Sequence, residues 1–87
     1  MKYTGDEIDQ LGNDIYESRL QALLETEENI GKIVSIDVIS GDYEIANDLL
    51  VSGLKLKERH PEAEMYGKRI GYNAVYALGG ALVRTAK

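Results

Sequence analysis

The sequence contains no cysteine, no tryptophan and no phenylalanine, and it has a single histidine and a single proline among 87 residues. The absence of cysteine excludes disulfide bonds, thiolate chemistry and the usual zinc-binding frameworks. Because His60 is the only histidine, a catalytic triad can take a histidine base from this position alone, and a histidine-rich metal site is excluded. We therefore expect no cofactor.

Long hydrophobic segments are also missing. No apolar run approaches the ~20 residues that a membrane-spanning helix needs. The N-terminal residues show no basic region followed by an apolar run, which a signal peptide would have. These absences lead us to expect a cytoplasmic protein that does not associate with a membrane.

Acidic residues outnumber basic ones, and the formal net charge is −5. The charge is unevenly distributed, since residues 66–87 carry four basic side chains and no acidic one. An acidic chain as a whole repels nucleic-acid phosphates, which disfavours nucleic-acid binding. Two interpretations of the basic segment stay open. It contacts the acidic N-terminal helix of its own chain, which we favour, or it binds nucleic acid weakly.

Residues 5–26 have the apolar spacing of an amphipathic helix. Apolar side chains recur three and four residues apart and form one stripe. Thr4 and Glu7 have the spacing of a capping box, in which each side chain accepts a hydrogen bond from the other residue's backbone N–H. Gly12 is a weak point inside this helix, because glycine costs ~1 kcal/mol relative to alanine. The stripe consists of Ile8, Leu11, Ile15, Tyr16, Leu20, Leu23 and Leu24.

A β-hairpin is predicted for residues 32–45. Residues 32–39 alternate with period two and are rich in β-branched side chains, which is typical of a strand. Ser40, Gly41 and Asp42 supply a short loop, and residues 43–45 resume the alternation.

A second helix is predicted for residues 47–59. Asn47 is a suitable N-cap, and Pro61 disfavours the helical conformation of the residue before it, so the helix should end near His60. The residues that share one face of this helix are Leu50, Val51 and Leu54.

Residues 64–71 and 73–78 alternate again and are predicted to be strands. The element order is therefore α-β-β-α-β-β. We expect an α+β fold, in which a four-stranded, largely antiparallel sheet carries two helices on one face. The chain forms a single domain, 1–87, with an acidic N-terminal helix (1–30), a β-β-α-β-β core (31–80) and a tail (81–87).

Asp37, Asp42, Glu44 and His60 are the candidates for an enzymatic or metal site. Carboxylates suit hard cations and general acid–base chemistry. Their spacing matches no calcium-binding loop, however, and acids beside a hairpin turn are expected for turn formation alone. We favour the interpretation that they form the solvated side of a hairpin, and keep a metal-dependent or acid–base site as the alternative.

A second candidate site is a group of tyrosine and arginine side chains near the C-terminus. These residue types are enriched at binding hot spots because they combine a large contact area with polar groups. A tyrosine on a sheet that is covered by a helix can equally belong to the core. If an open face or edge of the sheet binds a protein partner, the predicted anchors are Tyr66, Arg69, Tyr72 and Tyr76.

The strings GKIVSIDVISGDYEI, ERHPEA and KRIGYNAVYALGG lie within residues 31–80. Over this range the chain resembles a family of small bacterial proteins of unknown function, frequent in cyanobacteria. Members of that family look like partners in two-gene cassettes, and some are labelled antitoxin-like or are encoded beside a small retroviral-type aspartic protease. The resemblance implies no catalytic residue. The positions that it marks are Asp37, Gly41, Asp42, His60, Pro61, Arg69, Gly71 and Tyr72.

These observations together indicate a small protein–protein interaction or assembly module that catalyses no reaction of its own. A single core is marginal in a chain of this size, and dimerisation is a common remedy. The expected partner is a second copy of the chain or a cognate protein, as in a homodimer or a heteromeric pair.

Overall fold

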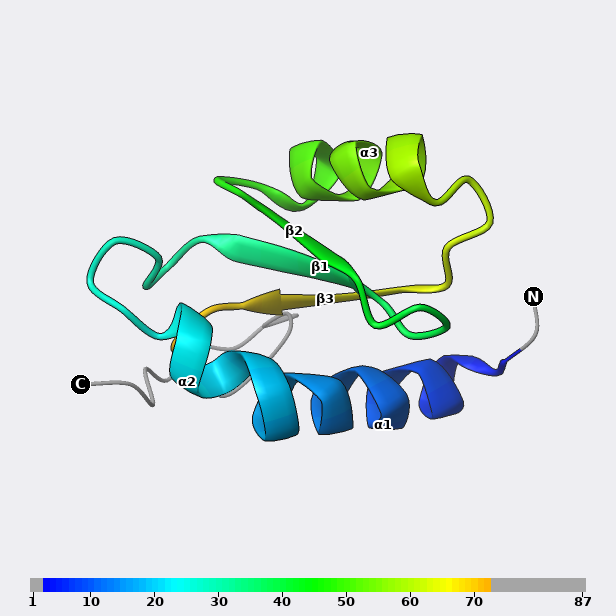
Figure 1. Ribbon diagram of the computed structural model, residues 1–87, viewed down its shortest axis with the longest axis horizontal. Coiled ribbons are helices and arrows are strands. Elements are labelled where there is room, and N and C mark those ends of the chain that lie inside the picture. Colours follow the sequence, from blue (N-terminus) through cyan, green and yellow to red (C-terminus); the bar gives the residue numbers. More distant parts are fainter. Residues whose placement is uncertain (1–2, 73–87) are drawn as a thin grey trace, which may run out of the picture.

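The computed structural model describes residues 3–72 and shows three layers: an N-terminal helical segment, an antiparallel sheet and a second helix (Figure 1). This confirms the α+β class. No helix within residues 3–72 has the length and apolar content to cross a membrane. The elements are α1 (Gly5–Ile15), the π-helix η1 (Tyr16–Leu20), α2 (Gln21–Leu24), β1 (Ile33–Asp37), β2 (Tyr43–Ala46), α3 (Leu49–Arg59) and β3 (Met65–Arg69).

The N-terminal helical segment begins at the predicted capping box. The Glu7 backbone N–H donates to Thr4 Oγ1 at 3.2 Å, and the Thr4 N–H donates to Glu7 Oε1 at 2.8 Å. Two orphan donors at the helix start are thereby satisfied. Gly12 is buried where α1 crosses β3, and the root of the Tyr66 side chain occupies the space that a Cβ atom would need. The glycine is therefore a packing requirement.

The described sheet has three strands in the order β2-β1-β3, and both pairings are antiparallel. In the register, Ile36 lies opposite Tyr43 on β2 and opposite Tyr66 on β3. The structure thus contains the first three of the four predicted strands. The fourth predicted strand (73–78) and the tail (81–87) lie outside the described residues.

The two helices lie on opposite faces of the sheet, so the expectation that both share one face is wrong (Figure 1). Tyr66 of β3 packs on α1, whereas Ser35 of β1 contacts Ser52 of α3. The physical reason is in β1, whose five residues are all buried. A central strand that has apolar side chains on both faces needs a covering layer on each side.

The main core fills the space between the N-terminal helical segment and one sheet face. Alternate residues of β1 point into it, as period two requires. The Lys68 ammonium also lies on this side, 5.0 Å from the centre of the Tyr16 ring. The core consists of Ile8, Tyr16, Leu20, Leu24, Val34, Ile36, Val38, Tyr66 and Ile70.

The opposite sheet face makes a smaller and more polar contact with α3. This helix buries two residues, Ser52 and Leu56. Ser52 Oγ donates to the Leu49 carbonyl oxygen at 3.1 Å and lies 2.8 Å from Ser35 Oγ. Either hydroxyl can donate in the bond between the two serines. The contact between α3 and β1 therefore includes a hydrogen-bonded serine pair, at a position where two apolar side chains are more usual.

Candidate functional site

The hairpin loop is organised around Asp37, which is buried rather than solvated. Its carboxylate accepts hydrogen bonds from the backbone N–H groups of Ile39 and Glu64, each at 3.1 Å, and from Ser40 Oγ at 2.7 Å. Burial alone would raise the pKa of Asp37. The hydrogen bonds lower the pKa by more than burial raises it, so the net shift is downward. Asp37 therefore ties the β1–β2 loop to the segment that leads into β3.

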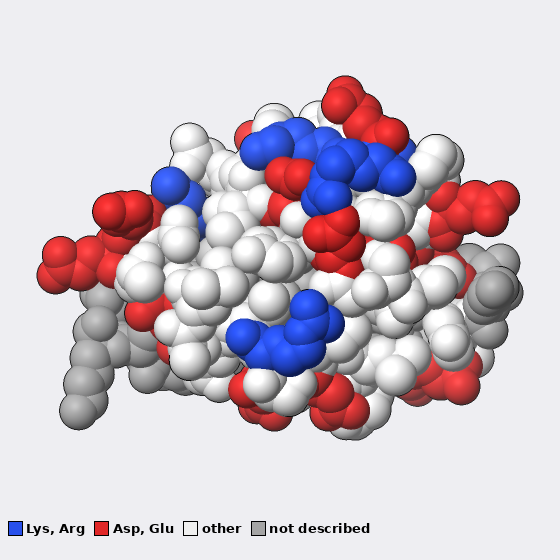
Figure 2. All heavy atoms as spheres, viewed as in Figure 1, with Lys and Arg blue, Asp and Glu red and all other residues white. Residues whose placement is uncertain are grey.

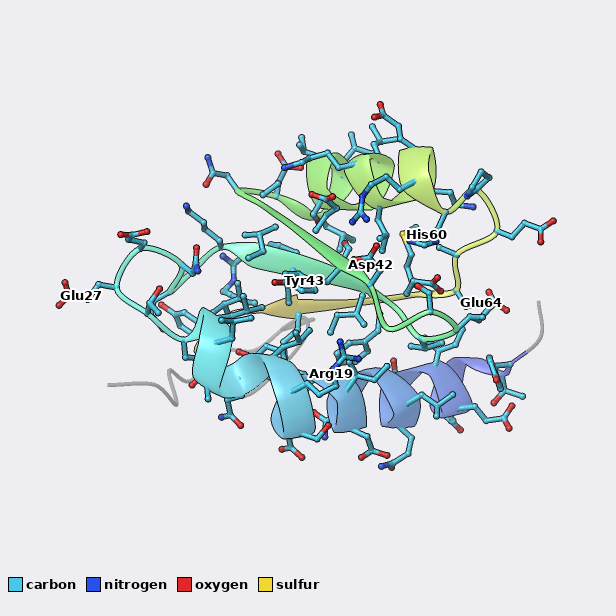
Figure 3. The ribbon with its side chains drawn as sticks, viewed as in Figure 1. Arg19, Glu27, Asp42, Tyr43, His60 and Glu64 are labelled. Carbon is cyan, nitrogen blue, oxygen red and sulfur yellow. The ribbon has the colours of Figure 1, made fainter. Side chains whose placement is uncertain are left out.

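Asp42 lies at the other end of the same loop and faces the C-terminal end of α3 (Figure 3). The His60 Nε2 atom is 2.8 Å from Asp42 Oδ2, and His60 Nδ1 is 4.0 Å from Asp37 Oδ2. Arg59 forms an ion pair with Asp42 and another with Glu44, the latter at 2.7 Å. Hydrogen bonds from Arg59 and then His60 hold the pKa of Asp42 well below its usual range.

The structure thus brings together all four candidate residues of the acidic site, but it uses their oxygens for internal contacts. Arg59 neutralises the two outer carboxylates, and Asp37 is saturated by loop N–H and O–H donors. Within residues 3–72, no group of three or more acidic or histidine side chains is arranged to hold a metal ion. Asp37, Asp42, Glu44, Arg59 and His60 form a polar cluster, here called the polar clamp, between the hairpin loop and the C-terminal end of α3. The prediction that the acidic residues only form the solvated side of a hairpin is therefore too simple.

Several positions marked by the family resemblance meet in this clamp. Gly41 adopts φ +80° in the loop, and the Arg19 guanidinium of η1 lies against it. The other members at this end of the sheet are Asp37, Asp42, His60 and Pro61. Arg69, Gly71 and Tyr72 lie at the opposite end of β3, where Arg69 Nη1 donates to the Gly31 carbonyl oxygen at 2.7 Å.

The predicted tyrosine–arginine anchors are placed differently from one another. Tyr66 is 5% exposed and belongs to the core, so its ring offers no surface to a partner. Arg69 and Tyr72 are half-buried, and Tyr72 accepts a hydrogen bond from the Lys68 ammonium through its carbonyl oxygen. Tyr76 lies outside the described residues. These side chains do not form one exposed group within the described part of the chain.

A group of exposed apolar side chains lies instead on the outer side of α3. Leu50 is 71% exposed, Leu54 57% and Val51 44%. We call these three residues the α3 outer face. Single exposed apolar side chains are ordinary, but three neighbouring ones on a helix that buries Ser52 and Leu56 depart from the usual amphipathic pattern.

An open groove of about 620 Å³ runs beside this face, between α3 and β3. Met65 and Gly67 of β3 form one side, and the leucines of α3 form the other. Gly53 also lines the groove, and the end of the Met65 side chain would lie within van der Waals contact, 3.7 Å, of a Cβ added there. Lys57 and Asp9 also line the groove and place one charge of each sign beside the apolar surface.

Other parts of the α3 surface are engaged in polar contacts. Lys55 Nζ donates to the Ile45 carbonyl oxygen and Arg59 Nη2 to that of Tyr43, both at 3.0 Å. These cations cover the outer edge of β2, a common protection against edge-to-edge pairing. Figure 2 shows the result, with basic and acidic side chains next to one another over α3. The apolar outer face is the part of this helix that has no such cover among the described residues.

Sequence reasoning grouped Leu50, Val51 and Leu54 on one face but did not identify it as exposed. A signal was present: five apolar residues between positions 49 and 56 are more than one buried stripe needs.

A scan of protein-family models and searches of curated proteins and solved structures returned no match to the chain.

Proposed function

We propose that this protein is a small interaction and assembly module that catalyses no reaction of its own, and that the α3 outer face is its docking surface. The observation that carries the proposal is the atypical pattern of α3, which buries Ser52 and Leu56 while it exposes Leu50, Val51 and Leu54. A helix that is apolar on both sides is normally covered on both sides.

The energetic argument supports the same conclusion. Fully burying a leucine or valine side chain stabilises a structure by ~1.5–3 kcal/mol. The chain leaves three such side chains in water on one helix, in a domain whose own core is small. A partner that covers them recovers the part of this free energy that corresponds to their exposed surface.

The polar clamp supports the proposal as a structural device. Asp42, Arg59 and His60 fix the C-terminal end of α3 to the hairpin loop, and Asp48 caps its N-terminal end by accepting from the Val51 N–H at 2.8 Å. Both ends of the helix are thereby held, and its outer face is presented in one orientation. Preorganisation of this kind lowers the entropic cost of binding.

The test measures whether the α3 outer face is covered in an extract of the producing organism. Because the chain has no cysteine, a single introduced thiol reports on one position. We expect the purified Leu54→Cys variant to react with a maleimide at least ten times more slowly in an extract whose own thiols are blocked, or in excess wild-type chain, than in dilute buffer. Leu23 is 60% exposed on α2, so Leu23→Cys is the matched control and should react equally fast in all three conditions.

Equal reaction rates at position 54 in dilute buffer, in extract and in excess wild-type chain would contradict the proposal. Slowing at both positions would show general crowding or unfolding and would also count against it. Circular dichroism of the two variants checks that each retains the fold.

A further inference from the structure

We propose that the occupant of the α3 outer face is a second copy of the same chain, which seats its Leu50–Leu54 ridge in the groove between α3 and β3. This inference rests on the proposed docking function and adds the identity of the partner. It is carried by the apolar side chains that line the groove and by the two residues of opposite charge that flank it.

The shape argument concerns the ridge and the groove, which lie side by side. Leu50 and Leu54 are one helical turn apart and are 71% and 57% exposed. These two leucines form part of one side of the groove of about 620 Å³, and Met65 and Gly67 of β3 form the other side. A two-fold axis places the ridge of one copy in the groove of the other, and each copy then fills the other's groove.

The charge argument concerns the two charged residues that flank the groove. Lys57 extends from α3, and Asp9 from α1. In a two-fold interface a contact from residue i to residue j occurs twice, so Lys57 of each copy can pair with the partner's Asp9. A partner with a different sequence would not require a lysine and an aspartate to lie on the same surface of this chain. Antiparallel packing of the two α3 helices also aligns their dipoles favourably.

The experiment is sedimentation velocity of the full-length chain over a concentration series. We expect wild type to pass from 9.6 kDa to twice that mass, and Leu54→Lys to raise the dimer dissociation constant at least ~100-fold, because the lost leucine occurs twice in the dimer. Leu23→Lys, which changes an equally exposed leucine outside the surface, should dimerise like wild type. Circular dichroism verifies that both variants fold.

A charge reversal tests the pairing without touching the leucines. Lys57→Asp and Asp9→Lys should each weaken the dimer several-fold, and the double variant should regain most of the loss. Added NaCl should reduce the difference in dissociation constant between wild type and the single charge variants, because salt screens the Lys57–Asp9 pairs.

Three results would overturn the inference. The first is a wild-type dimer that Leu54→Lys leaves intact. The second is a wild-type monomer at all concentrations whose position 54 is protected only in the extract, which leaves the docking proposal standing and assigns the face to a different protein. The third is a monomer in which position 54 is protected even in dilute buffer, which assigns the face to residues 73–87 of the same chain and contradicts both proposals.

Discussion

Two helical glycines should respond in opposite ways to the same substitution. A Cβ added at Gly12 would lie 2.5 Å from Tyr66 Cδ2 and closer still to Cγ and Cβ, atoms at the immobile root of that side chain. Overpacking of this kind costs ~1–3 kcal/mol, and the upper end applies because backbone has to move. Alanine recovers ~1 kcal/mol of helix propensity. We expect Gly12→Ala to destabilise the fold by ~2 kcal/mol.

Gly53 is the control, because an added Cβ would meet its nearest neighbours, in Met65, at 3.7 Å. Gly53→Ala should therefore gain the propensity of ~1 kcal/mol. In a chain of this size, 1 kcal/mol shifts the midpoint of thermal unfolding by ~4–8 °C. The assay is thermal and urea unfolding at concentrations too low for association, since dimerisation adds to apparent stability. Shifts of the same sign in both variants would refute the packing of α1 on β3 through Gly12.

Three further predictions concern polar and titratable groups. Ser35→Ala and Ser52→Ala should each cost ~1–2 kcal/mol in urea unfolding, and the double variant less than their sum, because either single variant already removes the bond between the two hydroxyls. The lowered pKa values of Asp37 and Asp42 contribute stability above the unfolded-state pKa of ~3.9, so the thermal midpoint should fall as pH drops below it, and less steeply in Asp37→Asn. Burial raises the pKa of Tyr66 from 10.0 to about 12, so stability should fall between those pH values by roughly 2–3 kcal/mol, and Tyr66→Phe should retain more of it. Flat profiles, or variants no different from wild type, would contradict these assignments.

The secondary structure could be predicted from sequence because local rules decide it. The Thr4–Glu7 spacing predicted the capping box, and alternation predicted the β1–β2 hairpin. The predicted start of the second helix was one residue early, since Asp48 rather than Asn47 accepts the capping bond. Neighbouring residues of similar chemistry compete for a cap, and local geometry chooses between them.

The layering and the site could not be predicted in the same way. Which face of α3 turns inward depends on a hydrogen bond between Ser52 and Ser35, residues 17 positions apart, and no periodicity rule favours a serine over a leucine. The burial of Asp37 likewise depends on the Glu64 N–H, which reaches it from a distant part of the chain. Long-range polar pairing therefore overrode the hydrophobic pattern, and it left the α3 outer face exposed.

The central claim is that the α3 outer face is covered when the protein assembles, and a methyl NMR spectrum followed through dilution tests it most directly. We predict concentration-dependent shifts for the methyl groups of Leu50, Val51 and Leu54, while the Leu23 signals stay constant. Unchanged α3 signals across the concentration range, or changes centred on α2, would contradict it.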